Sequence, residues 1–389
     1  MNTGTYIFSQ VASLLPKRVF DGIVKKYGGD KYVKGYSCWN HLMVTMYGQL
    51  AGCSSLREFI CIAHAHKSKC YHLGFGKSEL SIGNLSTANS RRDYKVFEEF
   101  AYHMMSIAQR KRNGRPFELN GRFFAFDSTT IDLCLSLFPW ANFRKTKAGI
   151  KAHTLLDITT QIPVYINITN AKVADVNAMD GIPFEPFAYY IFDRGYNDFE
   201  RLYKINLISS QFIVREKRRM KYEIVSSGEE LPNDGNVILD QTIRLTGQKT
   251  RSKYPVALRR IVYYSPEHKR TFTFLTNNFT LKAETIAFLY KNRWLVECFF
   301  KWIKSHLRVN SFWGTTENAV RIQIYVAIIT YCLVAIIEHD LRLNRSTFDV
   351  LRIIGASLLS KEPLRDLLDP AQPEPVCQMV EPQLFENFN

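Results

Sequence analysis

The spacing of apolar residues divides the chain into an N-terminal part with helical periodicity and a longer part with strand periodicity. In residues 1–112 apolar positions recur every three or four residues, which predicts amphipathic helices. A shorter helix at 80–89, followed by Arg91 and Arg92, would suit either a helix-turn-helix-like reader of DNA or a solvated connection. The other helices are expected at 6–15, 19–27, 39–50, 56–64 and 93–112.

Beyond residues 109–116, which have the basic, Gly- and Pro-containing composition of a linker, the apolar period changes to two. Short helices are expected at 176–180 and 198–205. The resulting order βββαβαβ, with the first three strands as a meander, indicates an α/β fold. Strands are expected at 122–127, 151–158, 164–168, 189–193 and 211–215.

Residues 216–270 have the pattern of a small β-rich insertion, with twelve Lys and Arg against seven acids. The chain would then rejoin the first sheet at 271–275 and continue into two long helices, at about 281–308 and 316–340. The last twenty residues contain four prolines, which predicts a poorly ordered tail. Strands of the insertion are expected at 222–225, 236–239, 242–245 and 259–264.

The composition of the chain indicates the kind of partner that it binds and the cell compartment in which it is located. With 46% apolar and 22% charged residues, the 389-residue chain is globular and long enough for two or three domains. Its net charge is +15, which favours a polyanion, nucleic acid ahead of an acidic membrane surface. The eight scattered cysteines and the lack of a signal-peptide pattern favour a cytoplasmic location. The longest uncharged apolar run, 324–337, predicts a buried helix rather than a membrane span.

Two aspartates stand where chemistry is expected. Asp127 and Asp193 each follow an apolar strand, and in α/β sheets the carboxyl ends of strands line the functional crevice. Two adjacent carboxylates repel each other unless a divalent cation is bound between them, and oxygen ligands favour Mg²⁺ or Mn²⁺. Taken singly, an aspartate at a strand end often only caps a helix or forms a turn. Asp132, Asp157 and Asp175 are nearby acids for which such roles suffice.

Glu297 is the best candidate for a third acid. On a helix of about 100° per residue, Tyr290, Arg293, Glu297 and Lys304 share one narrow stripe. An acid among two bases and a tyrosine suits a metal ligand flanked by phosphate-holding groups, although a surface ion-pair stripe would have the same spacing. Trp294, Phe300 and Trp302 would face elsewhere and pack.

The stripe resembles the Tyr-Arg-Glu-Lys signature of bacterial insertion-sequence DDE transposases of the branch often called the "IS-four" family. Asp127, within Phe-Asp-Ser-Thr, resembles the first acidic position of that family, and Asp193, within Asp-Arg-Gly-Tyr, resembles the second. The order of two aspartates, a β-rich insertion and a helical glutamate is also similar. These segments span residues 123–304, about half of the chain.

The resemblance implies an α/β protein with a ribonuclease-H-like catalytic core, interrupted by the β-rich insertion and preceded by an all-helical N-terminal domain. Asp127, Asp193 and Glu297 would bind two Mg²⁺ ions, with Mn²⁺ as a possible substitute, for cleavage at transposon ends and strand transfer into target DNA. Tyr290, Arg293 and Lys304 would hold DNA phosphates. The partners would be the terminal inverted repeats, the target DNA and a second copy of the chain, without a membrane.

The implied organisation has five parts. They are a helical DNA-binding domain (1–112), the first part of the core (113–215), the insertion (216–270), the second part of the core with C-terminal helices (271–345), and a C-terminal segment with a flexible tail (346–389). The insertion contains no tryptophan, whereas relatives that cut through a DNA hairpin hold a flipped base with one there. A hairpin step is therefore not assigned.

Several alternatives stay open from the sequence. Cys61, His64, His66 and Cys70 could ligate zinc, but they lack a paired C-x2-C knuckle. The basic runs 143–151 and 215–221 could contact phosphate or form solvated faces. A nuclease that hydrolyses DNA without strand transfer, or an inactive DNA-binding regulator derived from a transposase, would share many of these features. The three intact acids argue against the inactive form.

Overall fold

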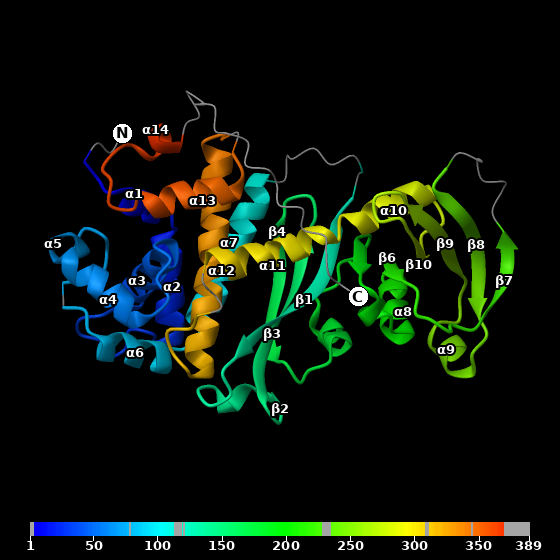
Figure 1. The fold of residues 1–389 in the computed structure, drawn as a ribbon, viewed down its shortest axis with the longest axis horizontal. Coiled ribbons are helices and arrows are strands. Elements are labelled where there is room, and N and C mark those ends of the chain that lie inside the picture. The colour runs from blue at the N-terminus through cyan, green and yellow to red at the C-terminus, as the bar shows by residue number, and fades with distance from the viewer. Residues whose placement is uncertain are drawn as a thin grey trace.

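The computed structural model describes residues 4–77, 79–112, 119, 121–227, 235–307, 311–343 and 345–368. A mixed sheet runs through the molecule, with a group of helices at one end (Figure 1). In the described ranges the sheet has ten strands, β1 (Phe123–Leu133), β2 (Asn142–Arg144), β3 (Lys147–Asp157), β4 (Ile162–Asn170), β5 (Tyr189–Phe192), β6 (Gln211–Arg215), β7 (Tyr222–Ser227), β8 (Val237–Leu245), β9 (Leu258–Ser265) and β10 (Arg270–Thr276).

The strand order is β2-β3-β1-β5-β6-β10-β9-β8-β7, and β3 also pairs with β4. The meander of β1, β3 and β4 is antiparallel, whereas β5 and β6 run parallel to β1. All five predicted strands of the first sheet are therefore confirmed, as is the α/β class. One detail differs, because β1 continues past Asp127 to Leu133 and pairs with β3 along ten positions.

The strands of the β-rich region extend the same sheet. β10 pairs with β6 on one side and with β9 on the other, and β8 and β7 follow. The two strands predicted at 236–239 and 242–245 form the single strand β8, because a bulge near residues 237–239 allows its pairing with β9 to continue. Helix α9 (Gln248–Lys253) connects β8 and β9.

The two faces of the sheet are covered by different helices. Alternate residues of β1 belong to different apolar clusters, so that Phe124 and Phe126 pack on one face and Ala125 on the other. Helix α8 (Phe199–Leu207) and the 3-10 helix at Asp175–Gly181 cover the first face. Helices α10 (Ala283–Lys291) and α11 (Trp294–His306) cover the second, which we call the α11 face (Figure 1).

The predicted single helix at about 281–308 is thus wrong in one respect. α10 ends at Lys291 and α11 begins at Trp294. Between them the chain makes three-residue turns, with the Arg293 N–H donating to the Tyr290 carbonyl at 3.1 Å and the Leu295 N–H to the Asn292 carbonyl at 3.1 Å. Asn292 and Arg293 keep right-handed helical dihedral angles. The break therefore does not require Gly or Pro, and neither residue type marks it in the sequence.

The remaining helices form one body around α12. Helix α7 packs along α12 and is amphipathic, with its apolar residues at three- and four-residue spacing in the core. α3, α6 and α13 also contact α12 (Figure 1). These helices are α1 (Ile7–Ser13), α2 (Lys17–Tyr27), α3 (Cys38–Leu50), α4 (Leu56–Ala65), α5 (Lys67–Cys70), α6 (Ile82–Arg91), α7 (Lys95–Arg112), α12 (Glu317–Asp340), α13 (Thr347–Ala356) and α14 (Leu364–Leu368).

The start of the predicted linker belongs to this helical body. Residues 109–112 form the last turn of α7, and Arg112 is buried, where its guanidinium donates to a Glu338 carboxylate oxygen of α12 at 2.5 Å. The ion pair stabilises the end of α7 at Arg112, which is where the helical periodicity predicts it, although residues 109–112 also have the composition of a linker. Residues 113–116 of the linker and the predicted tail at 370–389 lie outside the described residues.

Helix α12 has the length and apolar composition of a membrane span, but 94% of its most apolar 18-residue window is buried inside the protein. A helix that is apolar on every side is suited to the centre of a large core. The prediction of a buried helix for this run is therefore confirmed.

Candidate active site

Two of the predicted acids lie at the same level of neighbouring parallel strands. Ala125 of β1 pairs with Ile191 of β5, and both side chains belong to the core under α11. Side chains alternate between the faces of a strand, so Asp127 and Asp193, two residues further along, also point toward the α11 face. Adjacent strands are about 4.8 Å apart, which keeps the two carboxylates close.

Glu297 reaches the same place from the first turn of α11, and Arg293 links it to Asp127. One terminal nitrogen of the Arg293 guanidinium donates to Asp127 Oδ2 at 2.7 Å, and the other donates to Glu297 Oε1 at 2.5 Å. The side chains of Arg293 and Asp127 are 16% and 20% exposed, whereas that of Glu297 is 47% exposed. The two acids therefore lie within the span of a single guanidinium group.

Asp193 is held by Tyr290 of α10, whose hydroxyl donates to Asp193 Oδ1 at 3.2 Å. The tyrosine ring is buried and lies against Phe274 of β10, with 4.6 Å between ring centroids. Burial raises the pKa of Tyr290 above its usual value, and the Asp193 carboxylate adds to this effect. Tyr290 therefore stays protonated at neutral pH and acts as a hydrogen-bond donor to Asp193.

The surroundings of Asp127 disfavour its charge. Burial raises its pKa to about 6, Arg293 and the Ser128 N–H oppose this shift, and the carboxylates of Glu297 and Asp193 add to it. The Ser128 N–H donates to Asp127 Oδ1 at 2.8 Å. A buried carboxyl group next to two further acids gains from any additional cation, and such perturbed groups concentrate at functional sites.

Comparison with known proteins shows the family of the chain. The chain matches the Transposase DDE domain over residues 119–333, a range that contains all three acids. The chain belongs to the DDE transposase family. Residues 3–76 match a separate domain of unknown function (DUF4372).

Relatives of this DDE transposase family member include "Putative transposase y4zB" of Sinorhizobium fredii, which is 35% identical over 77% of this chain and 83% of the relative. A second relative is "Probable transposase for insertion sequence element IS5377" of Geobacillus stearothermophilus, 27% identical over 72% and 75% of the two chains. A third, from Synechocystis, is 24% identical over 72% and 79% and is named as a putative transposase for an insertion sequence element. The chain is thus related to bacterial insertion-sequence transposases.

DDE transposase domains generally use divalent metal ions, and the three acids offer the all-oxygen ligands that such ions favour. In the ranges that the structure describes, no three His, Cys, Asp or Glu side chains are already gathered as a metal site. Instead, the guanidinium of Arg293 occupies the position between Asp127 and Glu297. The chemistry of the donors therefore fits a metal, while their present arrangement holds an arginine.

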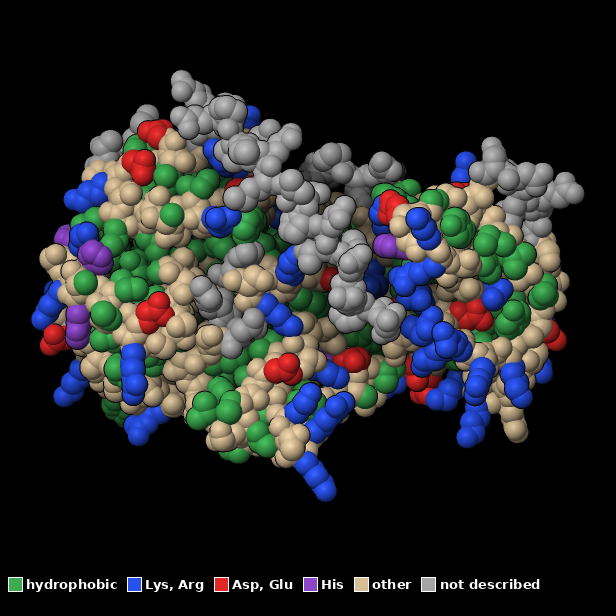
Figure 2. Space-filling model, in the orientation of Figure 1, with side chains coloured by type: hydrophobic (Ala, Val, Ile, Leu, Met, Phe, Trp, Pro, Cys, Tyr) green, Lys and Arg blue, Asp and Glu red, His purple; other side chains and the backbone are tan. Residues whose placement is uncertain are grey.

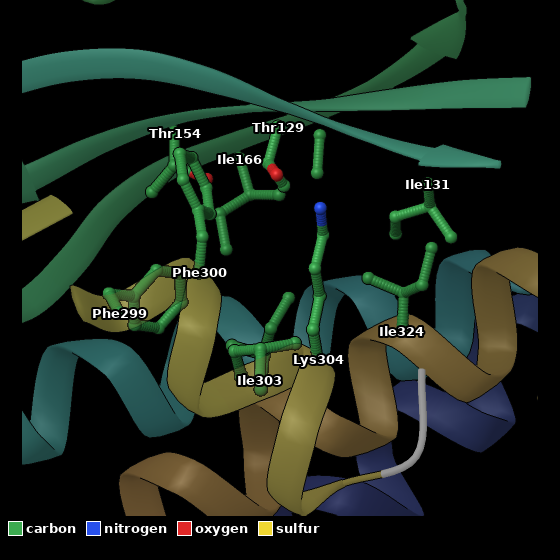
Figure 3. A pocket seen from close by; sticks show the side chains of 11 residues that line it. Thr129, Ile131, Thr154, Ile166, Phe299, Phe300, Ile303, Lys304 and Ile324 are labelled. Carbon is green, nitrogen blue, oxygen red and sulfur yellow. The ribbon is translucent and has the colours of Figure 1, made fainter. Parts of the chain in front are cut away.

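Lys304, the last member of the signature, lies away from the acids. Its ammonium group donates to the Thr130 carbonyl of β1 at 2.7 Å. Its side chain rises from α11 into a small cavity of about 20 Å³ that is lined mostly by apolar residues, among them Ile131, Ile303 and Ile324 (Figure 3). Burial in this cavity lowers the pKa of Lys304. In this structure the lysine thus ties α11 to the strand that carries Asp127.

Arg215 is a neighbour of the acids that the sequence analysis named only as the first residue of the basic run 215–221. Val214 of β6 pairs with Phe192 of β5, so Arg215 stands at the level of Asp193, on the same face. Its guanidinium lies over the Phe272 ring, 5.1 Å from the centroid. Its charge acts to lower the pKa of Tyr290. Its place at the carboxyl end of a parallel strand was the available signal.

Trp294 was predicted to pack, and this is wrong, because its side chain is 60% exposed at the first position of α11. Phe300, in contrast, is buried as predicted. The difference follows from the break before α11, since Trp294 starts a new helix instead of continuing the buried side of α10. An exposed indole next to Arg293 is available for stacking.

The cysteine and histidine group of the N-terminal region has little of the character of a metal site. Cys70 Sγ donates to the Ala63 carbonyl at 3.3 Å, and Cys61 is exposed on α4. Among the residues described, no metal-ligand cluster includes them. The seven cysteines in the described ranges form no disulfide.

Proposed function

We propose that this protein is the transposase of an insertion sequence, which cleaves DNA at the ends of its element and joins those ends to target DNA. Asp127, Asp193 and Glu297 are its proposed catalytic acids. The observation that carries the proposal is that Arg293 bonds to Asp127 and Glu297 while Tyr290, whose ring centroid lies 5.9 Å from the Arg293 guanidinium, bonds to Asp193. The sheet order, with β5 and β6 parallel to β1 beside an antiparallel meander, supports a ribonuclease-H-like core.

The proposed ligands of the metal are the three carboxylates, and we propose two Mg²⁺ ions, with Mn²⁺ as a substitute. When bound, such ions lower the pKa of an attacking water or 3′-hydroxyl and stabilise the leaving oxygen at phosphorus. The residues of the chain supply the arrangement. β1 and β5 fix the spacing of Asp127 and Asp193, Tyr290 orients Asp193 through its hydroxyl, and α11 carries Glu297 above them.

The proposed DNA contacts are the signature residues and the exposed basic residues of the neighbouring β-rich region. Tyr290, Arg293 and Lys304 are the contacts implied by the signature, and Arg215 extends them along the sheet. Figure 2 shows Lys and Arg side chains gathered over the half of the molecule that carries α9 and β8 to β10. Exposed basic residues of this region include Lys217, Arg218, Arg219, Lys221, Lys249, Arg251, Lys253, Lys269 and Arg270. Phosphate contacts from such residues give affinity and salt dependence.

The helices of residues 1–112 are the proposed readers of the element ends, and two copies of the chain would hold two ends together. Helix α6, which ends at Arg91, is the candidate for base contacts. Its first turn is capped by Ser81, whose hydroxyl accepts from the Asn84 N–H at 3.2 Å. The indole of Trp294 is open to a base, so it is the candidate for stacking if cleavage passes through a hairpin.

The function is tested with the purified chain, a plasmid target and a duplex ending in the inverted repeat that flanks the gene. With Mg²⁺ we expect cleavage and joined products. Asp127→Asn, Asp193→Asn and Glu297→Gln should each lower cleavage by about 10³-fold or more while DNA binding persists. Asp132→Asn, on the same strand but exposed, is the matched control and should stay active.

Each alternative has its own outcome in this experiment. Cleavage without joined products would identify a nuclease, and binding without cleavage would identify a regulator. An acid variant with full activity would remove that residue from the proposed catalytic group.

A further inference from the structure

Arg293 occupies the oxygens that a metal ion would need. Its guanidinium is bonded at once to Asp127 Oδ2 and to Glu297 Oε1, at 2.7 and 2.5 Å. The other oxygen of Asp127 accepts the Ser128 N–H at 2.8 Å, so both oxygens of that carboxylate are engaged. The arginine is itself mostly buried between the acids. The site thus already contains one internal cation.

An arginine and a metal ion cannot both bind these oxygens in the same way. Mg²⁺ lies about 2.0–2.1 Å from its oxygen ligands, closer than the guanidinium nitrogens are to the same two atoms. A metal ion bridging Asp127 and Glu297 would lie in the space of the guanidinium and be repelled by its charge. The absence of a preformed metal cluster among the described residues agrees with this competition.

The Arg293 guanidinium, which bridges Asp127 and Glu297, does not use all of its hydrogen-bond donors. This lowers the free energy needed to move it away from the two acids. Its Nε is buried and has no hydrogen-bond partner among the described residues. A buried N–H without a partner costs free energy, about 1–3 kcal/mol in general. A DNA phosphate can accept two parallel hydrogen bonds from a guanidinium. Its negative charge would replace that of the carboxylates as the partner of Arg293.

We propose that Arg293 keeps divalent metal out of the acid site of the free protein, and that a DNA phosphate opens the site by taking over the guanidinium. The proposal rests on the function proposed above for the identity of the acids. Under this proposal metal binding and DNA binding are cooperative. When Arg293 moves away from the acids, the carboxylates become free to bind metal and the guanidinium becomes free to bind a DNA phosphate. Such coupling is reciprocal, so that metal strengthens DNA binding by the factor by which DNA strengthens metal binding.

The test is Mn²⁺ binding to the full chain without DNA, measured by electron paramagnetic resonance of the unbound ion. Arg293→Gln should bind Mn²⁺ at least about tenfold more tightly than the wild type, within the usual range of coupling between sites. Lys301→Gln is the matched control, because it removes one charge from an exposed position of α11, a turn beyond Glu297, that makes no ion pair in the described part of the chain. Its affinity should change by less than about twofold.

A second arm adds a saturating duplex of an already cut element end, in which no bond remains to be hydrolysed. The duplex should raise the Mn²⁺ affinity of the wild type by about 5–150-fold and leave that of Arg293→Gln nearly unchanged. Arg293→Lys keeps the charge but cannot bridge two carboxylates, so it should bind Mn²⁺ with intermediate affinity. It also serves if Arg293→Gln does not fold.

Equal Mn²⁺ affinity of the wild type and both Arg293 variants would overturn the proposal. So would a wild-type affinity that does not respond to the duplex. Neither result bears on cleavage by the acid variants, so failure here is distinguishable from failure of the proposed function.

Discussion

Arg215 is positioned by strand register and by an aromatic ring rather than by a carboxylate. It ends β6 beside Asp193, and its guanidinium lies over Phe272. In the described residues no acid forms an ion pair with it. A guanidinium fixed in this way, at the carboxyl end of a parallel strand, is free to bind an anion in the crevice.

We expect Arg215→Ala to weaken binding of the element end and to reduce the slope of log affinity against log salt by about 1, because one phosphate contact is lost. The measurement is a fluorescence-anisotropy titration at several salt concentrations. Arg352→Ala, an exposed position on α13, removes the same charge outside the sheet and is the control. An unchanged slope for Arg215→Ala would show that this side chain contacts no phosphate.

At the level of single residues, the sequence predicted which positions come together better than how they interact. Arg293 bonds to Asp127 and Glu297, and Tyr290 bonds to Asp193 with its ring centroid 5.9 Å from the Arg293 guanidinium. The ligand roles of the acids and the phosphate contacts stay predictions. The spacing of four residues allows the pair of Arg293 with Glu297, but periodicity could not foresee the bond of Arg293 to Asp127, because that bond depends on the relative position of α11 and β1.

At the level of elements, the break between α10 and α11 marks the limit of periodicity. The connecting residues Asn292 and Arg293 keep helical dihedral angles, and the helical spacing of apolar residues continues from α10 into α11. The sequence pattern therefore does not reveal the break. Only the tertiary packing distinguishes a bent pair from a straight helix. β1 shows the same limit, since its length is set by ten pairing partners in β3 rather than by its own apolar residues.

Helices α3 and α6 are joined by a buried histidine. His41 Nε2 lies 2.7 Å from Asn89 Oδ1, and burial, together with the nearby charge of Arg92, lowers the pKa of His41 to about 3. The histidine therefore stays neutral in the folded protein, whereas it takes up a proton below about pH 6.5 in the unfolded chain. The unfolded state then binds more protons, so stability falls as the pH falls.

We expect the free energy of unfolding to fall by about 1.6 kcal/mol from this group alone between pH 6.5 and 5, since each pH unit contributes about 1.4 kcal/mol once the unfolded histidine is protonated and less near pH 6.5. Urea unfolding at several pH values measures this. His41→Gln, which cannot titrate, should have a shallower pH dependence over that interval. Wild type and variant with parallel pH profiles would contradict the assignment.

For the molecule as a whole, α12 joins the beginning of the chain to its end. Gln49 of α3 donates through its side-chain amide to the Gln323 carbonyl of α12 at 2.8 Å. The Asn318 amide of α12 donates to the carbonyls of Asn89 and Arg92. Nearly every residue between 319 and 338 is buried. The sequence predicted the N-terminal helices correctly, but it gave no sign that they share one core with α12.

We therefore expect a fragment of residues 119–368 to be much less stable than the full chain, because it would expose the apolar residues of α12 that α3, α6 and α7 cover. Binding of a hydrophobic dye and analytical ultracentrifugation should detect exposed apolar surface and aggregation. Co-expression with residues 1–112 should restore a soluble complex. A monodisperse fragment with cooperative unfolding would show that the two parts are separate domains.

The hydrogen-bonded continuity of the sheet has a mechanical consequence. From β1 through β5, β6 and β10 to β9, each strand is laddered to the next, at about 4.8 Å per step. The outer strands therefore cannot swing as a hinged arm without breaking the β6–β10 ladder. In the proposed function, a nucleotide bound on the outer strands would lie at a fixed distance from Asp127. The sheet would then determine which phosphodiester bond of the bound DNA lies next to the acids.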